Sequence, residues 1–197
     1  AVLRPDYEGL GSPGVHPYLI GEPLARSVLD MVAARTTFDA RIGDRWVSAG
    51  HSEGSMAALF TARADVARPL PLLGVAAFTP VTRMDVTIGA ARRLPVVLPG
   101  CAIFSPLIAL MIRGAATVSP RMAELVAGDG LSPAARGLWP HLDQRCAEEL
   151  ARSDSWGGLP PARIGGVRGE ELFAELWAVM RHNEVRGLDL AEVPVRI

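Results

Sequence analysis

A continuous apolar run, Leu72–Phe78, constrains the fold of this chain more than any other stretch of its sequence. Pro71 and Pro80 bound the run, and such a segment is typical of a strand buried on both faces of a parallel sheet. A second strand is expected at Arg45–Ala49, and a helix at Ser55–Ala67 lies between the two. Strands that alternate with helices form a parallel sheet with helices on its faces, so the sequence predicts an α/β fold.

The beginning of the chain continues this pattern. Ala1–Leu3 is apolar and compatible with a strand, and the Gly- and Pro-rich stretch Tyr7–Gly21 is expected to be a loop. Apolar residues then recur at three- and four-residue spacing from Leu24 to about Arg35, which predicts an amphipathic helix. A polar connection is expected over Thr36–Asp44.

After residue 80 the pattern becomes helical, and no strand is evident up to about residue 185. Helices are expected at Pro120–Ala127, Pro133–Ala151 and Glu170–Asn183. A helical insertion of this size resembles a cap over a site. We therefore predict a partial core over residues 1–80, a mostly helical cap or lid over residues 81–190, and the start of the next core strand over residues 191–197.

One apolar stretch within the predicted cap, Val96–Ile112, has two interpretations. It is marginal in length for crossing a membrane, and Pro99 and Pro106 are each expected to interrupt a helix. A buried or lid-like segment is the first interpretation. The second is a membrane-inserted segment, which would make the chain a membrane-anchored interaction protein.

Composition narrows the classes of function. The chain has 20 basic and 21 acidic residues, with no basic run, so nucleic acid is not an expected partner. The hydrophobic content of 49% excludes a disordered chain. Cys101 and Cys146 lack the spacing of metal ligands, so no metal is expected; a disulfide in an exported protein and two free thiols remain alternatives.

The sequence Gly50-His51-Ser52-Glu53-Gly54 matches G-x-S-x-G, the nucleophile elbow, and lies where an expected strand meets an expected helix. This turn exposes a serine on strained backbone, and small residues at Gly50 and Gly54 let strand and helix approach closely. Ser52 is thus the predicted nucleophile, and the N–H of Glu53 is a predicted oxyanion donor. His51 is expected to pack or hydrogen-bond beside the site rather than act as the base.

A simpler interpretation of the same residues stays open. A Gly-rich turn between a strand and a helix can carry a serine that merely caps the helix. The Glu53 carboxylate can likewise be a solvated acid at the helix N-terminus.

Four stretches, including the elbow, resemble the secretory lipase family of α/β-hydrolases, which includes yeast lipase A-type enzymes and bacterial relatives. They are Pro5–Gly11, Pro13–Tyr18, Ala25–Asp30 and Gly50–Gly54. The resemblance covers residues 1 to about 80 and reaches the remainder only in its helical, apolar character. It implies a partial α/β-hydrolase parallel sheet with a mostly helical cap or lid insertion.

The resemblance also implies roles for single residues. Ser52 corresponds to the acylated nucleophile, and Asp6 to a second oxyanion-hole contributor beside the Glu53 N–H. Tyr7 and Glu8 are expected to brace that loop. From its residue type alone, Asp6 is a turn-forming aspartate after a strand.

In the family, the acid and the histidine of the triad follow the cap. We therefore expect them beyond Ile197, in a longer protein of which this chain is an inactive internal fragment. The chain order serine, acid, histidine leaves one internal alternative, Asp154 with His182. The family implies secretion or a cell-envelope location, although this segment carries no signal peptide.

The function that follows is hydrolysis of small-molecule or lipid carboxylic esters through an acyl-serine, without a cofactor. The cap is expected to contact a lipid interface transiently. Alternatives are an acyltransferase or thioesterase of the same superfamily, or a catalytically incomplete relative that acts as a binding module. The sequence does not indicate the oligomeric state.

Overall fold

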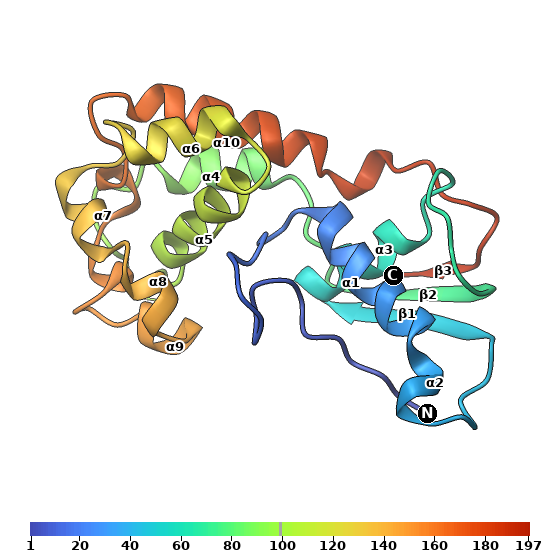
Figure 1. The fold of residues 1–197 in the computed structure, drawn as a ribbon. Coiled ribbons are helices and arrows are strands. Elements are labelled where there is room, and N and C mark those ends of the chain that lie inside the picture. The colour runs from blue at the N-terminus through green and yellow to red at the C-terminus, as the bar shows by residue number, and fades with distance from the viewer. Residues whose placement is uncertain (99) are drawn as a thin grey trace. The chain divides into compact units, whose positions relative to one another are not determined.

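The computed structural model describes residues 1–98 and 100–197, which form two compact units (Figure 1). The first unit contains residues 1–82 and 183–197, and the second contains residues 83–182. The second unit is therefore inserted in the sequence between the two parts of the first.

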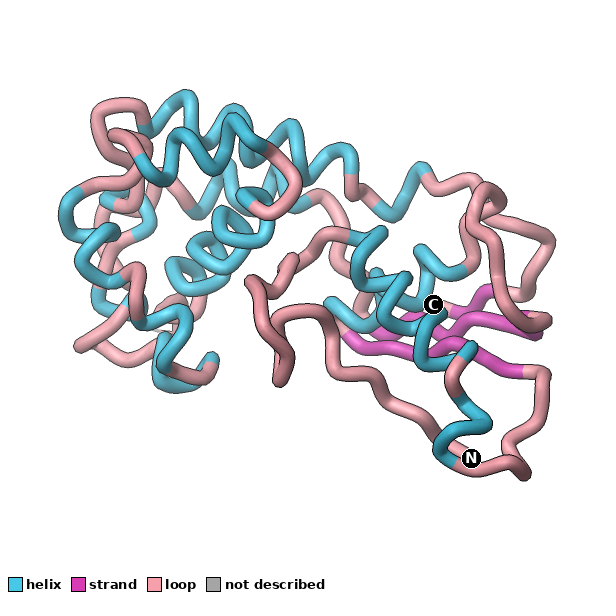
Figure 2. Tube along the Cα trace, in the orientation of Figure 1, coloured by secondary structure: helices cyan, strands magenta, loops and turns pink. Residues whose placement is uncertain are grey.

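A three-stranded parallel sheet forms the centre of the first unit (Figure 2). Its strands are β1 (Trp46–His51), β2 (Leu72–Phe78) and β3 (Val195–Arg196), in the order β1-β2-β3. Both pairs are parallel, and the end of β1 lies beside the end of β2, with His51 opposite Phe78. The predicted α/β fold class and the bounds predicted for β2 are confirmed.

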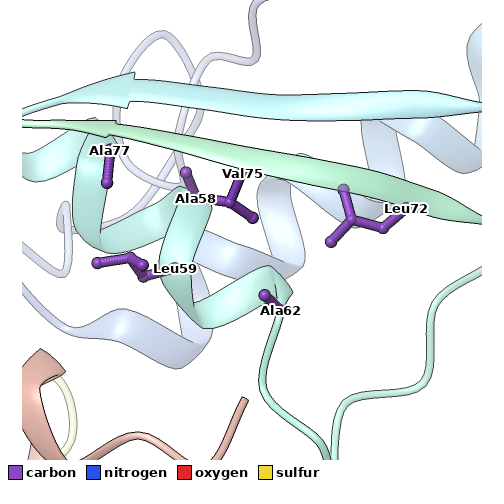
Figure 3. Close-up of a cluster of buried hydrophobic side chains, with 6 residues drawn as sticks. All are labelled: Ala58, Leu59, Ala62, Leu72, Val75 and Ala77. Carbon is purple, nitrogen blue, oxygen red and sulfur yellow. The ribbon is translucent and has the colours of Figure 1, made fainter. Parts of the chain in front are cut away.

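Helix α3 (Glu53–Thr61) packs against the sheet, and α1 (Gly21–Ala33) packs against α3. The core between α3 and β2 is made of small and branched apolar side chains (Figure 3). These are Ala58, Leu59, Ala62, Leu72, Val75 and Ala77. Small residues on α3 allow the helix to lie close to the strand.

Burial of β2 on both faces was a wrong prediction. Leu73 and Phe78 are 49% and 59% exposed, because the helices of the first unit cover one face of the sheet. The segment Asn183–Ile197 returns to this unit through the 3-10 turn η3 (Val185–Gly187). There the buried Asn183 side chain accepts the N–H of Gly21 at 2.8 Å through Oδ1.

Three further details of the first unit differ from expectation. Ala1–Leu3 is not a strand; among the described residues no strand pairs with it. Part of the predicted connection Thr36–Asp44 belongs to a short helix, α2 (Arg35–Phe38), which continues the chain from α1. The helix predicted at Ser55–Ala67 is α3, which begins two residues earlier and ends sooner.

The described part of the second unit is helical and contains no strand. Its elements are α4 (Met84–Ala91), α5 (Phe104–Ala116), α6 (Pro120–Ala127), α7 (Pro133–Leu138), α8 (His141–Gln144), α9 (Ala147–Leu150), η1 (Trp156–Gly158), η2 (Pro161–Arg163) and α10 (Gly169–His182). Helix α10 packs against α4, α5 and α6. The single helix predicted at Pro133–Ala151 is instead α7, α8 and α9. The break between α8 and α9 lies at Arg145 and Cys146, where the backbone is extended.

The apolar stretch Val96–Ile112 ends in α5, whose side chains Ile108, Met111 and Ile112 are buried in the second unit. Pro106 does not interrupt this helix, contrary to prediction, because it lies in the first turn, where no backbone N–H is required. Pro99 lies outside the described residues. Among the helices of the described part, none has the length and apolar character that a membrane crossing requires.

Candidate active site

Ser52 lies at a sharp turn between β1 and α3. Its backbone adopts φ 53° and ψ −115°, a conformation that costs a non-glycine residue about 1–3 kcal/mol. The turn is held by its own hydrogen bonds, since the Ser52 N–H donates to the Phe78 carbonyl at 3.0 Å. The Ser52 carbonyl accepts from the N–H groups of Ser55 and Met56 at 3.0 and 3.3 Å. Strain of this kind, maintained by the surrounding structure, is the backbone feature expected of a nucleophile elbow.

The Ser52 side chain is not a helix cap. It stands at the N-cap position of α3 but makes no capping hydrogen bond. Its hydroxyl has no hydrogen-bond partner among residues 1–98 and 100–197, and the half-buried residue lines a pocket. The interpretation of Ser52 as a simple capping serine is therefore wrong for this structure.

The two glycines of the motif have different roles. A Cβ atom on Gly50 would lie 1.9 Å from the carbonyl oxygen of Gly54 and 2.7 Å from the nitrogen of Ser55. No backbone tolerates such contacts, so this position of β1 admits only glycine. A Cβ atom on Gly54 would lie 3.7 Å from the Tyr7 hydroxyl, which is ordinary van der Waals contact. Of the two motif glycines, only Gly50 is therefore required for the close approach of β1 to α3.

Two backbone donors lie beside Ser52. Among the described residues, the N–H groups of Glu53 and Gly54 donate to no backbone or side-chain acceptor. They are the first two N–H groups of α3, where the helix dipole favours negative charge. The arrangement can therefore accept an oxyanion that forms on a carbonyl attacked by the Ser52 hydroxyl.

Asp6 lines the same pocket as Ser52, although 46 positions separate them in the sequence. The Asp6 side chain is exposed, and its Oδ2 atom lies 4.0 Å from the position a Cβ on Gly11 would occupy. The structure thus brings together the two predicted oxyanion contributors, Asp6 and Glu53, around one cavity. Residues 1–5 of the described structure contain no strand, so Asp6 does not lie in a turn that directly follows a strand formed by Ala1–Leu3.

The pocket has a volume of about 1150 Å³ and runs along β1 to the elbow. Apolar side chains from the N-terminal segment and α1 line much of it, among them Leu3, Val28 and Met31. Its polar lining includes Arg4 and Arg45. The cavity is large enough for a small ester with an apolar acyl group.

Sequence reasoning assigned no role to His16, yet the structure connects this residue to the elbow. His16 Nε2 lies 3.0 Å from Oε1 of Glu53, and His16 Nδ1 lies 3.0 Å from the carbonyl oxygen of Glu8. Tyr7 stacks on the His16 ring, with centroids 5.9 Å apart. The sequence offered one signal for His16, its position in the stretch Pro13–Tyr18 that resembles the lipase family. That signal did not indicate a contact with Glu53.

Burial and the Glu53 carboxylate shift the pKa values in this cluster. Burial, assisted by the charge of Glu53, raises the pKa of Tyr18 to about 12 and also raises the pKa of Tyr7. Burial acts to lower the pKa of His16, but the hydrogen bond to Glu53 and the charges of Glu53 and Glu8 outweigh it, so the pKa is raised. Glu53 itself is not the solvated acid that its helix position suggested, since its side chain is 18% exposed.

In the described part of the chain, the surroundings of the other three histidines do not match those of the base in a catalytic triad. The His51 side chain is exposed, lines the pocket and makes no hydrogen bond among the described residues, so the hydrogen-bonding role expected of it is absent. His141 pairs through Nδ1 with the Ser155 hydroxyl at 2.9 Å. Asp154 pairs with Arg145 at 2.9 Å, rather than with the exposed His182.

His16 does not fit the role of the base either. Both of its ring nitrogens are engaged, by Glu53 and by the Glu8 carbonyl. No group of three His, Cys, Asp or Glu side chains in the described part of the chain could hold a metal ion. Cys101 and Cys146 are both free thiols, so the disulfide alternative is wrong for this structure.

Comparisons with known proteins address the fold. No family model matches the chain, and no curated protein matches its sequence. A crystal structure of a protein from Legionella pneumophila, described as a "putative hydrolase", superposes with a TM-score of 0.69 at 20% identity. The match covers 94% of this chain and 50% of the other, so the chain spans about half the length of that protein. The chain therefore shares the fold of that protein in part, and this fold is a partial α/β fold with a parallel sheet and a mostly helical insertion.

Proposed function

We propose that this chain carries the nucleophile of a serine hydrolase that cleaves carboxylic esters, of the secretory lipase type. The observation that carries the proposal is the conformation of Ser52. Its strained turn leaves the hydroxyl without a partner among the described residues, beside two unpaired helix N–H groups and a pocket that apolar side chains line in part. The fold shared with a protein described as a hydrolase agrees with this proposal.

In the proposed reaction, a histidine base takes the proton of the Ser52 hydroxyl while Oγ forms a bond to the acyl carbon. The carbonyl oxygen becomes an oxyanion, which accepts hydrogen bonds from the N–H groups of Glu53 and Gly54, and Asp6 is proposed as a further contributor to the hole. The alcohol leaves with the proton of the histidine. Water then attacks the acyl-serine with the help of the same base, and releases the acid and the free hydroxyl.

The base and its acid are proposed to come from sequence outside residues 1–197. The side-chain pairs of His141 and Asp154 within the second unit agree with this proposal. So does the length of the structural neighbour, of which this chain spans half. Residues 1–197 alone are therefore expected to carry the nucleophile but not to catalyse ester hydrolysis.

The apolar part of the pocket lining, which includes Leu3, Val28 and Met31, supports an ester with an apolar acyl group as the proposed substrate. The arginines of the same lining, Arg4, Arg35, Arg41 and Arg45, leave room for a polar or anionic part elsewhere in the substrate. Transient contact of the second unit with a lipid interface also remains part of the proposal. Secretion or a cell-envelope location remains part of the proposal.

The test combines labelling and turnover. A fluorophosphonate probe should modify Ser52, as located by mass spectrometry, and p-nitrophenyl butyrate should be hydrolysed by the longer protein. Ser52→Ala should abolish both signals. Ser27→Ala, which removes a hydroxyl bonded to the Pro23 carbonyl on α1, is the matched control and should change neither. Labelling at another serine, or full activity in Ser52→Ala, would refute the proposal.

A further inference from the structure

The carboxylate of Glu53 turns back into the protein, although its residue directly follows the proposed nucleophile. Its Oε1 accepts the Nε2–H of His16 at 3.0 Å and the N–H of Leu19 at 3.1 Å. The side chains of His16 and Glu53 are 14% and 18% exposed. A carboxylate with so little access to water requires charged or strong hydrogen-bond donors, and the loop before α1 supplies two.

The backbone of that loop is strained where it meets Glu53. Leu19 is buried and adopts φ 59°, a left-handed conformation that leucine seldom takes. In this conformation its N–H reaches the carboxylate. Strain that is maintained at a contact with a candidate active site is a reason to look for a role of the contact.

The ring of His16 faces acceptors on both sides. One nitrogen meets the Glu53 carboxylate and the other meets the Glu8 carbonyl, each at 3.0 Å. A neutral imidazole carries one N–H and can satisfy only one of these acceptors, whereas the imidazolium satisfies both. The geometry therefore favours the positively charged ring.

The titratable groups around His16 in the described structure agree with a charged ring. They are the carboxylates of Glu53 and Glu8 and the phenols of Tyr7 and Tyr18, whose rings lie 5.9 and 6.1 Å from that of His16. The phenols stay neutral because burial raises their pKa values. The charged neighbours are thus both negative.

We propose that His16 is the counter-ion of the nucleophile elbow, a positioning residue that cancels the charge of Glu53 so that an oxyanion can form beside Ser52. This inference rests on the proposed function. An unpaired carboxylate one residue from Ser52 would repel the developing oxyanion, and the repulsion is strong where water is scarce. His16 acts through Glu53 and does not touch the substrate. Hydrolysis should accordingly weaken as the pH rises through the pKa of His16.

The first test measures the ring directly. NMR titration of His16 in the protein should give a pKa above the ordinary value of 6.5, and Glu53→Gln should lower it. A His16 ring that titrates at or below 6.5 would overturn the counter-ion role, whether or not ester hydrolysis is observed. This measurement on the unmodified protein does not depend on the folding of any variant.

The second test removes the two charges one at a time and then together. In the longer protein, His16→Gln keeps a donor but removes the positive charge, and kcat for p-nitrophenyl butyrate should fall about tenfold or more with little change in KM. The double variant His16→Gln/Glu53→Gln should recover a large part of that loss, and its profile should lack the decline of the wild-type rate at high pH. If His16 merely braced the loop, the double variant would be no faster than His16→Gln.

The matched control is Arg26→Gln, which breaks an exposed ion pair with Glu22 on α1 of the same unit and should change neither kcat nor the pH profile. Circular dichroism of each variant verifies that it folds. If neither the wild type nor any of these variants shows hydrolysis that depends on Ser52, the proposed function is refuted, and this inference with it. Ser52-dependent hydrolysis in which His16→Gln is as fast as wild type, or the double variant is no faster than His16→Gln, would refute the counter-ion role alone.

Discussion

Replacement of Gly50 by alanine should separate β1 from α3 and disable the elbow. The added Cβ would lie 1.9 Å from the carbonyl oxygen and 2.1 Å from the carbonyl carbon of Gly54. Both are backbone atoms, so no side-chain rotation relieves the contact. Strand and helix must move apart by about 1 Å, at a cost of about 3 kcal/mol or more. A displacement of about 1 Å at a nucleophile is also expected to slow its reaction by about 100-fold.

Urea unfolding and the rate of fluorophosphonate labelling at Ser52 measure the two effects. Gly187→Ala, where the added Cβ meets open space in the same unit, should change the unfolding free energy by less than about 0.5 kcal/mol. Gly54→Ala should be destabilised less than Gly50→Ala, because its Cβ makes only an ordinary contact with Tyr7 at 3.7 Å. If Gly50→Ala unfolds at the wild-type urea concentration and labels at the wild-type rate, the close approach inferred for the elbow is incorrect.

Three other outcomes are expected. Trp156→Ala should lower the unfolding free energy of the second unit by about 3–5 kcal/mol, since the side chain is fully buried; a loss below about 1 kcal/mol in urea unfolding would contradict this packing. Asn183→Ala should destabilise the first unit by about 1–3 kcal/mol, because the buried N–H of Gly21 loses its acceptor, and faster amide exchange at Gly21 would report that loss. Burial acts to lower the pKa of His16 and the bond to Glu53 outweighs it, so stabilisation by this pair is complete below pH 6.5 and is lost as the pH rises through the raised folded-state pKa. Urea unfolding as a function of pH should show this loss in the wild type, and an equal loss in His16→Gln would assign it to another group.

Much of the first unit could be predicted from local sequence. The bounds of β2 follow from an apolar run between two prolines, and the turn at Ser52 follows from a motif of five residues. Both depend on neighbours in the chain, whose conformational preferences act at short range. Local signals also have limits. The apolar run did not reveal that Phe78 is exposed, because composition does not show which faces of a sheet are covered.

The amino-acid sequence by itself determined the alternation of strands and helices, the strained turn with its serine, and the requirement for a small residue at Gly50. Only the tertiary structure decided that His16 pairs with Glu53, 37 residues away, and that Asn183 binds Gly21, 162 residues away. Preferences for strand, turn and helix are properties of a few adjacent residues, and they are visible in the spacing of apolar residues along the sequence. A pair between distant side chains depends on the path of the whole chain and on which polar groups remain without water after folding.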